Sequence, residues 1–179
     1  MVSCTTKRSW KQNYEKKTPS QTRNRIRQKI QQIIKTKEGV GTKFLKYSLK
    51  HVPHFIGVFP VDDIDKLSLC PESSFIVNLD FSTQPGSHWV AIKLTAKNCF
   101  IIDSLGGVLP YGPLTNFLTK ISQHRKIIKS PAFQPKKSNL CGFYCLYFLL
   151  LLQFTTFSNL CKSFSTDLNL NDNKLLDFF

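Results

Sequence analysis

The sequence lacks the long apolar run that a membrane-spanning helix requires. Crossing a bilayer takes about 20 consecutive apolar residues, and no stretch of even about 18 occurs in this chain. The first residues, Met1 to Arg8, also lack the apolar centre of a secretory signal peptide. We therefore expect an intracellular protein that has no membrane partner.

The cysteines do not form the pattern of a metal site or a disulfide framework. Six cysteines are scattered at positions 4, 70, 99, 141, 145 and 161. The Cys141-x-x-x-Cys145 spacing belongs to no zinc or redox motif, and no second cluster of Cys or His accompanies it. Disulfides are rare inside cells, so the sequence predicts reduced thiols and no metal site.

Acidic residues are scarce at the start of the chain. Residues 1–50 contain 14 Lys and Arg but only 2 acidic residues, whereas residues 51–179 contain 11 Lys and Arg and 9 acidic residues. Nearly all of the net charge of +14 thus belongs to the first quarter. This asymmetry divides the chain into a basic N-terminal arm, residues 1–40, and a domain of residues 41–179 that is long enough to bury a core.

The arm combines a polar leader with an amphipathic pattern. Residues 1–20 are poor in apolar side chains, and we expect them to be disordered. Isoleucines at positions 26, 30, 33 and 34 recur at helical spacing and predict a helix over residues 21–37 with a basic polar face. That face carries the candidate nucleic-acid contacts Arg23, Arg25, Arg27 and Lys29. The alternative is a solvated leader that keeps the protein soluble or directs it to the nucleus.

The segment from Leu140 to Leu152 starts with a cysteine and continues as an unbroken apolar run. It contains no turn residue from Phe143 onward and is too long for an ordinary strand, so it predicts a buried helix. A thiol in the first turn of a helix lies at the positive end of the helix dipole, which stabilises the thiolate. Cys141 is therefore a candidate nucleophile, although free cysteines are also common as buried packing residues.

Two further residues lie where a histidine base and its orienting acid are needed. His88 opens an apolar strand over residues 88–94, and Asp103 closes a second strand over residues 100–103. The turn-like residues between them predict an antiparallel hairpin, which places the start of the first strand beside the end of the second. His88 and Asp103 are then neighbours, and the carboxylate can hold the imidazole tautomer.

Gln134 lies in a proline- and lysine-rich loop shortly before Cys141. Its side-chain amide and the main-chain N–H groups near Cys141 are candidate oxyanion donors. Each candidate also has a plain alternative role, as a surface histidine, a turn aspartate or a solvated loop glutamine. Their order along the chain, each at the boundary of an element, favours a catalytic site.

The rest of the pattern predicts an α+β fold, with a small mixed or antiparallel sheet packed on helices. The chain shows no internal repeat. Further helices are expected over residues 42–50 and 114–124, and further strands over residues 75–79 and 126–130. Beyond Phe154 we expect a turn and then a short helix or an ordered tail.

The order of these motifs resembles that of the adenovirus-type cysteine proteases (adenain-like) and their SUMO and ubiquitin-like protease relatives. Such enzymes are found in DNA viruses and in virus-like large DNA transposons. The resemblance extends from about Leu45 to about Leu160 and implies a papain-related core with the nucleophile at the start of a buried helix. It rests on His88-Trp89, then Asp103-Ser104-Leu105-Gly106, then Gln134, then Cys141-Gly142-Phe143-Tyr144-Cys145.

The resemblance also implies a role for each site residue. These roles are base for His88, orienting acid for Asp103, oxyanion donor for Gln134, nucleophile for Cys141, and support for Trp89 and Gly142. Many adenoviral members carry Glu at the position of Asp103, and the aspartate also suits the SUMO-protease branch. Trp89 is expected to pack beside the catalytic ring.

The activity that the resemblance implies is that of a thiol endopeptidase. Its substrates are viral or virus-like precursor proteins, cleaved after a small residue such as glycine during particle maturation. No cofactor is needed for the chemistry, but DNA bound through the arm and a short peptide are candidate activators. We expect a monomer in the host nucleus or the virion. Two alternatives stay open: a SUMO or ubiquitin-like deconjugating isopeptidase, and a non-catalytic basic nucleic-acid-binding protein.

Overall fold

The computed structural model describes residues 4–36, 38–107 and 112–179, and it contains a five-stranded mixed sheet. The strands lie in the order β1-β2-β3-β4-β5, with antiparallel pairs in the centre and a parallel pair at each edge. Their bounds are β1 (Phe55–Pro60), β2 (Ser74–Asn78), β3 (Trp89–Leu94), β4 (Asn98–Ile102) and β5 (Lys126–Lys129). The predicted α+β fold with a mixed sheet is confirmed.

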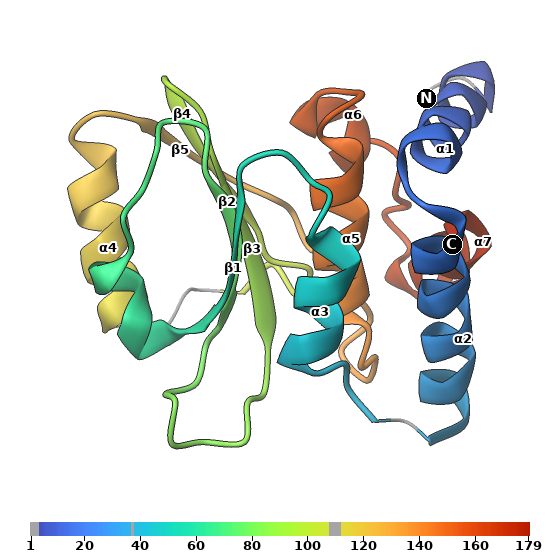
Figure 1. Ribbon diagram of the computed structural model, residues 1–179, viewed down its shortest axis with the longest axis horizontal. Helices are drawn as coiled ribbons and strands as arrows, with labels where there is room; N and C mark the ends of the chain where they lie inside the picture. Colours follow the sequence, from blue (N-terminus) through green and yellow to red (C-terminus); the bar gives the residue numbers. More distant parts are fainter. Residues whose placement is uncertain (1–3, 37, 108–111) are drawn as a thin grey trace.

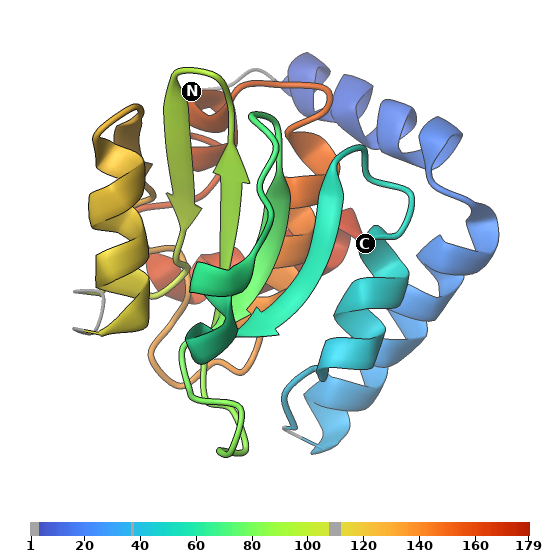
Figure 2. The same ribbon diagram turned by 60° about the vertical axis from the view of Figure 1, so that its left-hand side comes forward.

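Helices cover both faces of the sheet (Figure 1). One face is covered by α3 (Thr42–Leu49) and α5 (Cys141–Leu151), and behind them lie α1 (Cys4–Lys17), α2 (Ser20–Thr36) and α7 (Asn171–Phe178). The other face is covered by α4 (Pro113–Ser122) and the 3-10 helix η1 (Val61–Lys66). The short helices α6 (Phe157–Cys161) and η2 (Leu168–Leu170) belong to the C-terminal part. Figure 2 shows α5 running along the back of the sheet.

The pleat of the strands divides the core into two clusters. In β2, Ile76 belongs to the cluster on the α5 side, whereas Phe75 and Val77 belong to the cluster on the α4 side. Successive side chains of a strand point to opposite faces, so a strand that is covered on both faces is apolar throughout. Helix α5 is buried over its whole length because it lies between the sheet and the outer helices. This position explains its unbroken apolar sequence.

Most of the predicted elements are confirmed, with ends that differ by a few residues. The helices expected over residues 42–50 and 114–124 are α3 and α4, and the strands expected over 75–79 and 126–130 are β2 and β5. The sequence does not predict β1, because Gly57 interrupts its apolar pattern. That glycine has a φ of 143° and follows the point where the register between β1 and β2 shifts.

The expected disorder of residues 1–20 is wrong over residues 4–17, which form α1. The reason is burial: Tyr14 packs on Phe178 of α7, with the ring centroids 5.2 Å apart. The predicted amphipathic helix is confirmed as α2, and three of its isoleucines are buried in the same cluster as α5, namely Ile26, Ile30 and Ile33. Residues 1–3 and 37 and the side chain of Ile34 lie outside the described part. The domain boundary near residue 40 stays a prediction.

Helices in the described part of the chain are too short or too polar to cross a bilayer. The longest of them is α2, with 17 residues, and its polar face carries several charges. The most apolar is α5, with 11 residues, and it is covered by protein on all sides. The apolar character of α5 is therefore accounted for by the core.

Candidate active site

Cys141 is the first residue of α5 and follows directly on a loop. The first hydrogen bonds of the helix run from the N–H groups of Phe143 and Tyr144 to the carbonyl of Leu140. The N–H groups of Cys141 and Gly142 therefore precede the intrahelical ladder, at the positive end of the helix. Cys141 is 8% exposed and lines a cleft, so its thiol can be reached only from the cleft.

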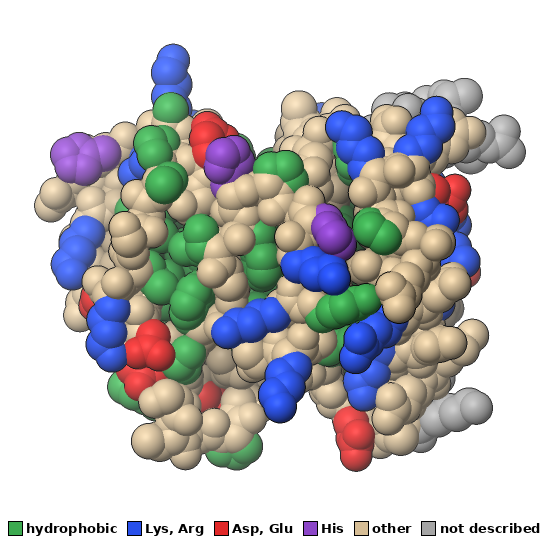
Figure 3. All heavy atoms as spheres, in the orientation of Figure 1, with side chains coloured by type: hydrophobic (Ala, Val, Ile, Leu, Met, Phe, Trp, Pro, Cys, Tyr) green, Lys and Arg blue, Asp and Glu red, His purple; other side chains and the backbone are tan. Residues whose placement is uncertain are grey.

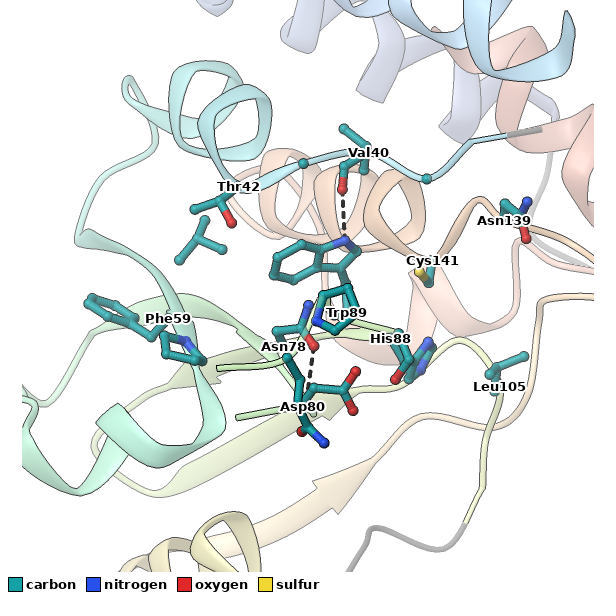
Figure 4. Close-up of a pocket in the computed structure, with 18 of the residues that line it drawn as sticks. Val40, Thr42, Phe59, Asn78, Asp80, His88, Trp89, Leu105, Asn139 and Cys141 are labelled. Carbon is teal, nitrogen blue, oxygen red and sulfur yellow. Dashed lines mark hydrogen bonds between the residues drawn. The ribbon is translucent and has the colours of Figure 1, made fainter. Parts of the chain in front are cut away.

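Gly142 lets this end of the helix approach the cleft wall. A side-chain carbon at this position would overlap the Cγ1 methyl of Val40 and lie 3.3 Å from Trp89 Cδ1. Trp89 is tied to the same loop, because its indole N–H donates to the Val40 carbonyl at 2.9 Å (Figure 4). The two supporting residues named from the sequence thus meet next to the thiol, and steric crowding is the reason for the glycine.

His88 and Asp103 meet at one end of the β3–β4 hairpin. The two strands pair antiparallel with Ala91 opposite Ile102, so the residue before β3 lies near the residue after β4. His88 Nε2 is 2.8 Å from Asp103 Oδ1, and both side chains are buried. Because Nε2 faces the carboxylate, ring Nδ1 is the nitrogen left for Cys141, with which His88 also forms a hydrogen bond.

Asp103 is held in place by more than the imidazole. Its Oδ1 also accepts the Leu105 N–H at 3.1 Å, and Lys129 Nζ lies 3.5 Å from its Oδ2. Ser130 donates its hydroxyl to the Asp103 carbonyl and accepts the Asp103 N–H, both at 3.0 Å. Burial raises the pKa of Asp103, but the hydrogen bonds and the nearby cations outweigh it and hold that pKa below its usual value. The carboxylate is therefore ionised and fixed.

The contacts of Lys129 and Ser130 are not predicted from the sequence. They arise because β5 returns beside β4 as a parallel edge strand, with Lys129 opposite Ile101. The end of β5 and the residue after it therefore contact Asp103. Parallel neighbours are joined by a long connection, here through α4, so no local pattern relates the two segments.

The imidazole of His88 has a raised pKa. Burial lowers the pKa of His88, but its hydrogen bonds with Asp103 and Cys141, and the negative charges of both, outweigh burial and raise the pKa to about 9. The imidazolium is therefore the form present at neutral pH. An adjacent imidazolium stabilises a thiolate, which is the reactive form of cysteine.

Gln134 is buried in the loop before α5 and lines the same cleft as the thiol. Its Oε1 accepts the Ser104 hydroxyl at 2.6 Å, and its Nε2 donates to the Ser138 carbonyl, also at 2.6 Å. A side-chain amide carries two N–H donors, so one remains after the bond to Ser138. Gly106 permits the two loops to approach, since a side-chain carbon there would lie 2.6 Å from Ala132 N. The role of Gln134 as an oxyanion donor stays a prediction.

The thiol and the imidazole lie on the wall of an open cleft with a volume of about 760 Å3 (Figure 4). Residues 39–42, which join α2 to α3, form one side, and the loop of residues 80–88 between β2 and β3 forms the other. Phe59 lines the end distant from Leu105. A cleft of this size accepts a ligand as large as a short peptide segment.

Comparison with known proteins found partial matches. No protein-family model matches the chain. Over 91 residues the chain is 29% identical to a cysteine protease of African swine fever virus, a match that covers 45% of this chain and 33% of that protein. The chain is distantly similar to a viral cysteine protease. It thus matches about a third of the length of this relative.

Two solved structures show a partial likeness to the fold. The crystal structure of the African swine fever virus protease matches with a TM-score of 0.44 at 23% identity, covering 62% of this chain and 43% of that one. A structure of the SUMO protease Ulp1, its catalytic cysteine oxidised to a sulfinic acid, matches with a TM-score of 0.42 at 15% identity. This second match covers 80% of this chain and 82% of that one.

The other described cysteines differ from the thiol of the cleft. Cys145 lies one turn further along α5, and burial raises its pKa well above the ordinary value. Burial likewise raises the pKa of Cys99 and of Cys161 to about 12. Cys70 is exposed. Across the described ranges, His, Cys, Asp and Glu side chains nowhere gather in threes as a metal site would require.

The four basic residues named as nucleic-acid contacts are engaged within the chain. Their partners are the Thr18 carbonyl for Arg23, the Tyr47 ring for Arg25, the Phe179 carbonyl for Arg27 and the Gln32 side chain for Lys29. Arg25 and Arg27 thus contact residues of the domain, whereas Arg23 contacts the backbone of the arm itself. On the face seen in Figure 3, Lys and Arg side chains are spread from the sheet side to the helical side. Nucleic-acid binding through these four residues stays a prediction.

Proposed function

We propose that this chain is a thiol endopeptidase of a DNA virus or virus-like transposon. The proposal is carried by the buried His88–Asp103 pair, 2.8 Å apart, which faces Cys141 at the start of a helix on the wall of a cleft. A nucleophile, a base and an orienting acid in mutual contact are the groups that acyl transfer requires. The distant similarity to a viral cysteine protease supports the same chemistry.

The first half of the reaction acylates the thiol. The Cys141 thiolate attacks the carbonyl carbon of the scissile peptide bond, and the electron pair of the C=O bond moves to oxygen. The N–H groups at the start of α5 and the free amide hydrogen of Gln134 are the donors for this oxyanion. The His88 imidazolium then gives its proton to the leaving amine as the C–N bond breaks, which leaves a thioester and a neutral imidazole.

The second half releases the new carboxyl end. Neutral His88 takes a proton from water, and the hydroxide that forms attacks the thioester carbon. Collapse of this second intermediate expels the Cys141 thiolate and restores the thiolate–imidazolium pair. Asp103 stays ionised throughout, since its lowered pKa favours the carboxylate, and it stabilises the imidazolium.

The finer parts of the proposal concern the substrate and the setting. Trp89 and Val40 crowd the cleft next to the thiol, which favours a small residue such as glycine before the scissile bond. We take the substrates to be precursor proteins cleaved during particle maturation, in the host nucleus or the virion. The basic arm is then the route by which DNA would activate a monomeric enzyme, with or without a peptide activator.

Labelling with iodoacetamide and site mapping by mass spectrometry tests the reactive thiol. We expect Cys141 to be alkylated faster than the exposed Cys70, although Cys141 is almost buried, because only Cys141 has an imidazolium partner. In His88→Ala this advantage should disappear, while labelling of Cys70 is unchanged. Equal rates at both cysteines in the wild type would contradict an activated thiol. Labelling with and without duplex DNA reports whether the arm activates the site.

Cleavage of a complex peptide mixture tests the reaction itself. A peptide library made from a bacterial proteome should yield new termini with the wild type and none with Cys141→Ala. Gln134→Ala should retain a measurable rate, because loss of one oxyanion donor costs about 10²–10³ in kcat. Tagged chains of SUMO or ubiquitin, tested in parallel, should stay intact; their cleavage would favour a deconjugating isopeptidase. An inert thiol with salt-sensitive DNA binding would instead favour the nucleic-acid-binding protein.

A further inference from the structure

The cleft contains a carboxylate that the mechanism does not use. Asp80 follows β2 and lies on the same side of the cleft as His88, across from Val40 and Thr42 (Figure 4). Among the described residues that line the cleft, Asp80 is the only acidic one. In the described ranges its carboxylate forms no ion pair and accepts no hydrogen bond, whereas other aspartates nearby are paired. It is thus available to a ligand in the cleft.

The backbone of Asp80 is held by hydrogen bonds on both sides, which fixes the point from which its side chain extends. Its N–H donates to Asn78 Oδ1 at 3.0 Å, and its carbonyl accepts the Val61 N–H at 3.3 Å. Ser82, two residues after Asp80, donates its N–H and its hydroxyl to the Asp62 carboxylate, both at 2.8 Å. These bonds attach the start of the loop after β2 to η1. A backbone that is already held in place loses little freedom when a ligand binds.

The surroundings of Asp80 suit a long cationic side chain. Phe59 and Phe81 also line the cleft, and they offer ring surface to the aliphatic stem of a lysine or arginine. The ammonium of Lys46 lies 5.9 Å from the centroid of the Phe59 ring, so this ring already contacts one cation of the chain. Lys136 also lines the cleft, but more distant positive charges of the chain oppose a cationic ligand only weakly, because charges beyond about 8–10 Å are screened at physiological salt.

We propose that Asp80 forms a subsite for a lysine or arginine side chain of the polypeptide substrate, close to the scissile bond. The inference rests on the proposed endopeptidase activity and adds a charge preference to it. The ammonium or guanidinium pairs with the Asp80 carboxylate, and the stem packs on the aromatic walls. A charge-assisted hydrogen bond in a partly enclosed cleft is stronger than an exposed ion pair, so the preference is large enough to measure.

The test uses peptides from a bacterial proteome digested with a glutamyl endopeptidase, so that lysine and arginine remain internal. The wild type, Asp80→Asn, Asp80→Lys and the control Asp63→Asn are compared. Asp63 carries the same charge but is paired with Lys66 outside the cleft. We expect one position near the cleaved bond to be enriched in Lys and Arg by about tenfold relative to Asp80→Asn. In Asp80→Lys the same position should be depleted in Lys and Arg, and Asp63→Asn should match the wild type.

A kinetic pair distinguishes binding from a structural effect. The best-cleaved peptide is compared with its analogue in which norleucine replaces the lysine. The ratio of kcat/KM for the lysine peptide to kcat/KM for the norleucine peptide should be about ten in the wild type and close to one in Asp80→Asn. The difference should lie in KM, and the wild-type ratio should fall as the salt concentration rises. A preference for Lys and Arg that survives in Asp80→Asn, or that is equally lost in Asp63→Asn, would overturn the subsite and leave the protease activity standing. No cleavage by the wild type would remove both.

Discussion

Replacing Gly142 by alanine should destabilise the protein despite a gain in helix propensity. Within a helix, alanine is favoured over glycine by about 1 kcal/mol. The added methyl, however, would overlap Val40 Cγ1 and lie 3.3 Å from Trp89 Cδ1 and 3.4 Å from Leu45 Cδ2, so it is crowded on three sides. Overpacking a close-packed interior costs about 1–3 kcal/mol. The net expectation is a loss of up to about 2 kcal/mol in the free energy of unfolding.

The double variant Gly142→Ala/Val40→Ala isolates this contact. Removing the γ methyls of Val40 opens the space, so the change at position 142 should cost about 1 kcal/mol less in the Val40→Ala background than in the wild type. Urea unfolding followed by circular dichroism supplies the free energies of the cycle. A coupling energy below about 0.5 kcal/mol would refute the reasoning, because Val40 would then not be the group that excludes a side chain at position 142.

Further predictions concern the charges and the wall of the site. The imidazolium of His88 persists until about pH 9, so kcat/KM should fall above that pH. In Asp103→Asn the fall should begin at a lower pH, and an unchanged pH profile would argue against the pairing. Because the pKa of Asp103 is lowered on folding, its stabilising effect is present above its unfolded pKa of about 3.9 and is lost as the pH falls through the folded pKa. Lys129→Met should make this loss begin at a higher pH, as measured by urea midpoints; coincident curves would show that the 3.5 Å contact does not matter. Trp89→Phe keeps an aromatic ring but removes the donor to the Val40 carbonyl, which costs about 0.5–1.5 kcal/mol. It should lower kcat/KM more than it slows iodoacetamide labelling of the cleft thiol, and an equal effect on both would mean that the wall is not affected.

The β3–β4 hairpin is the part of the site that the sequence predicts most directly. Two apolar runs with a short turn between them pair antiparallel, which brings His88 and Asp103 to the same end of the sheet. The helix that begins at Cys141 is predicted just as directly. Its apolar run of 11 residues has no polar face and is too long for an ordinary strand, which indicates a core helix. Both features depend on the backbone geometry of neighbouring residues, so a local pattern is enough.

Other features depend on segments that are distant in the sequence. Residues 4–17 are polar enough to suggest disorder, yet they form a helix, because Tyr14 is buried against Phe178 from the other end of the chain. Arg23 and Arg27, which the sequence suggests as nucleic-acid contacts, also donate to backbone carbonyls of the arm and the C-terminal segment. Composition describes what a segment contains and not what it packs against, so these outcomes cannot be predicted from it.

The sequence alone is sufficient to propose Cys141, His88 and Asp103 as nucleophile, base and acid, and to place each at the boundary of a strand or a helix. It does not reveal that β5 supplies Lys129 to the acid, that Val40 leaves room only for Gly142, or that Asp80 faces the cleft. Those contacts join segments far apart in the chain. They form because burial of apolar surface is gained over the whole fold at once, and no single stretch of sequence records which surfaces will meet.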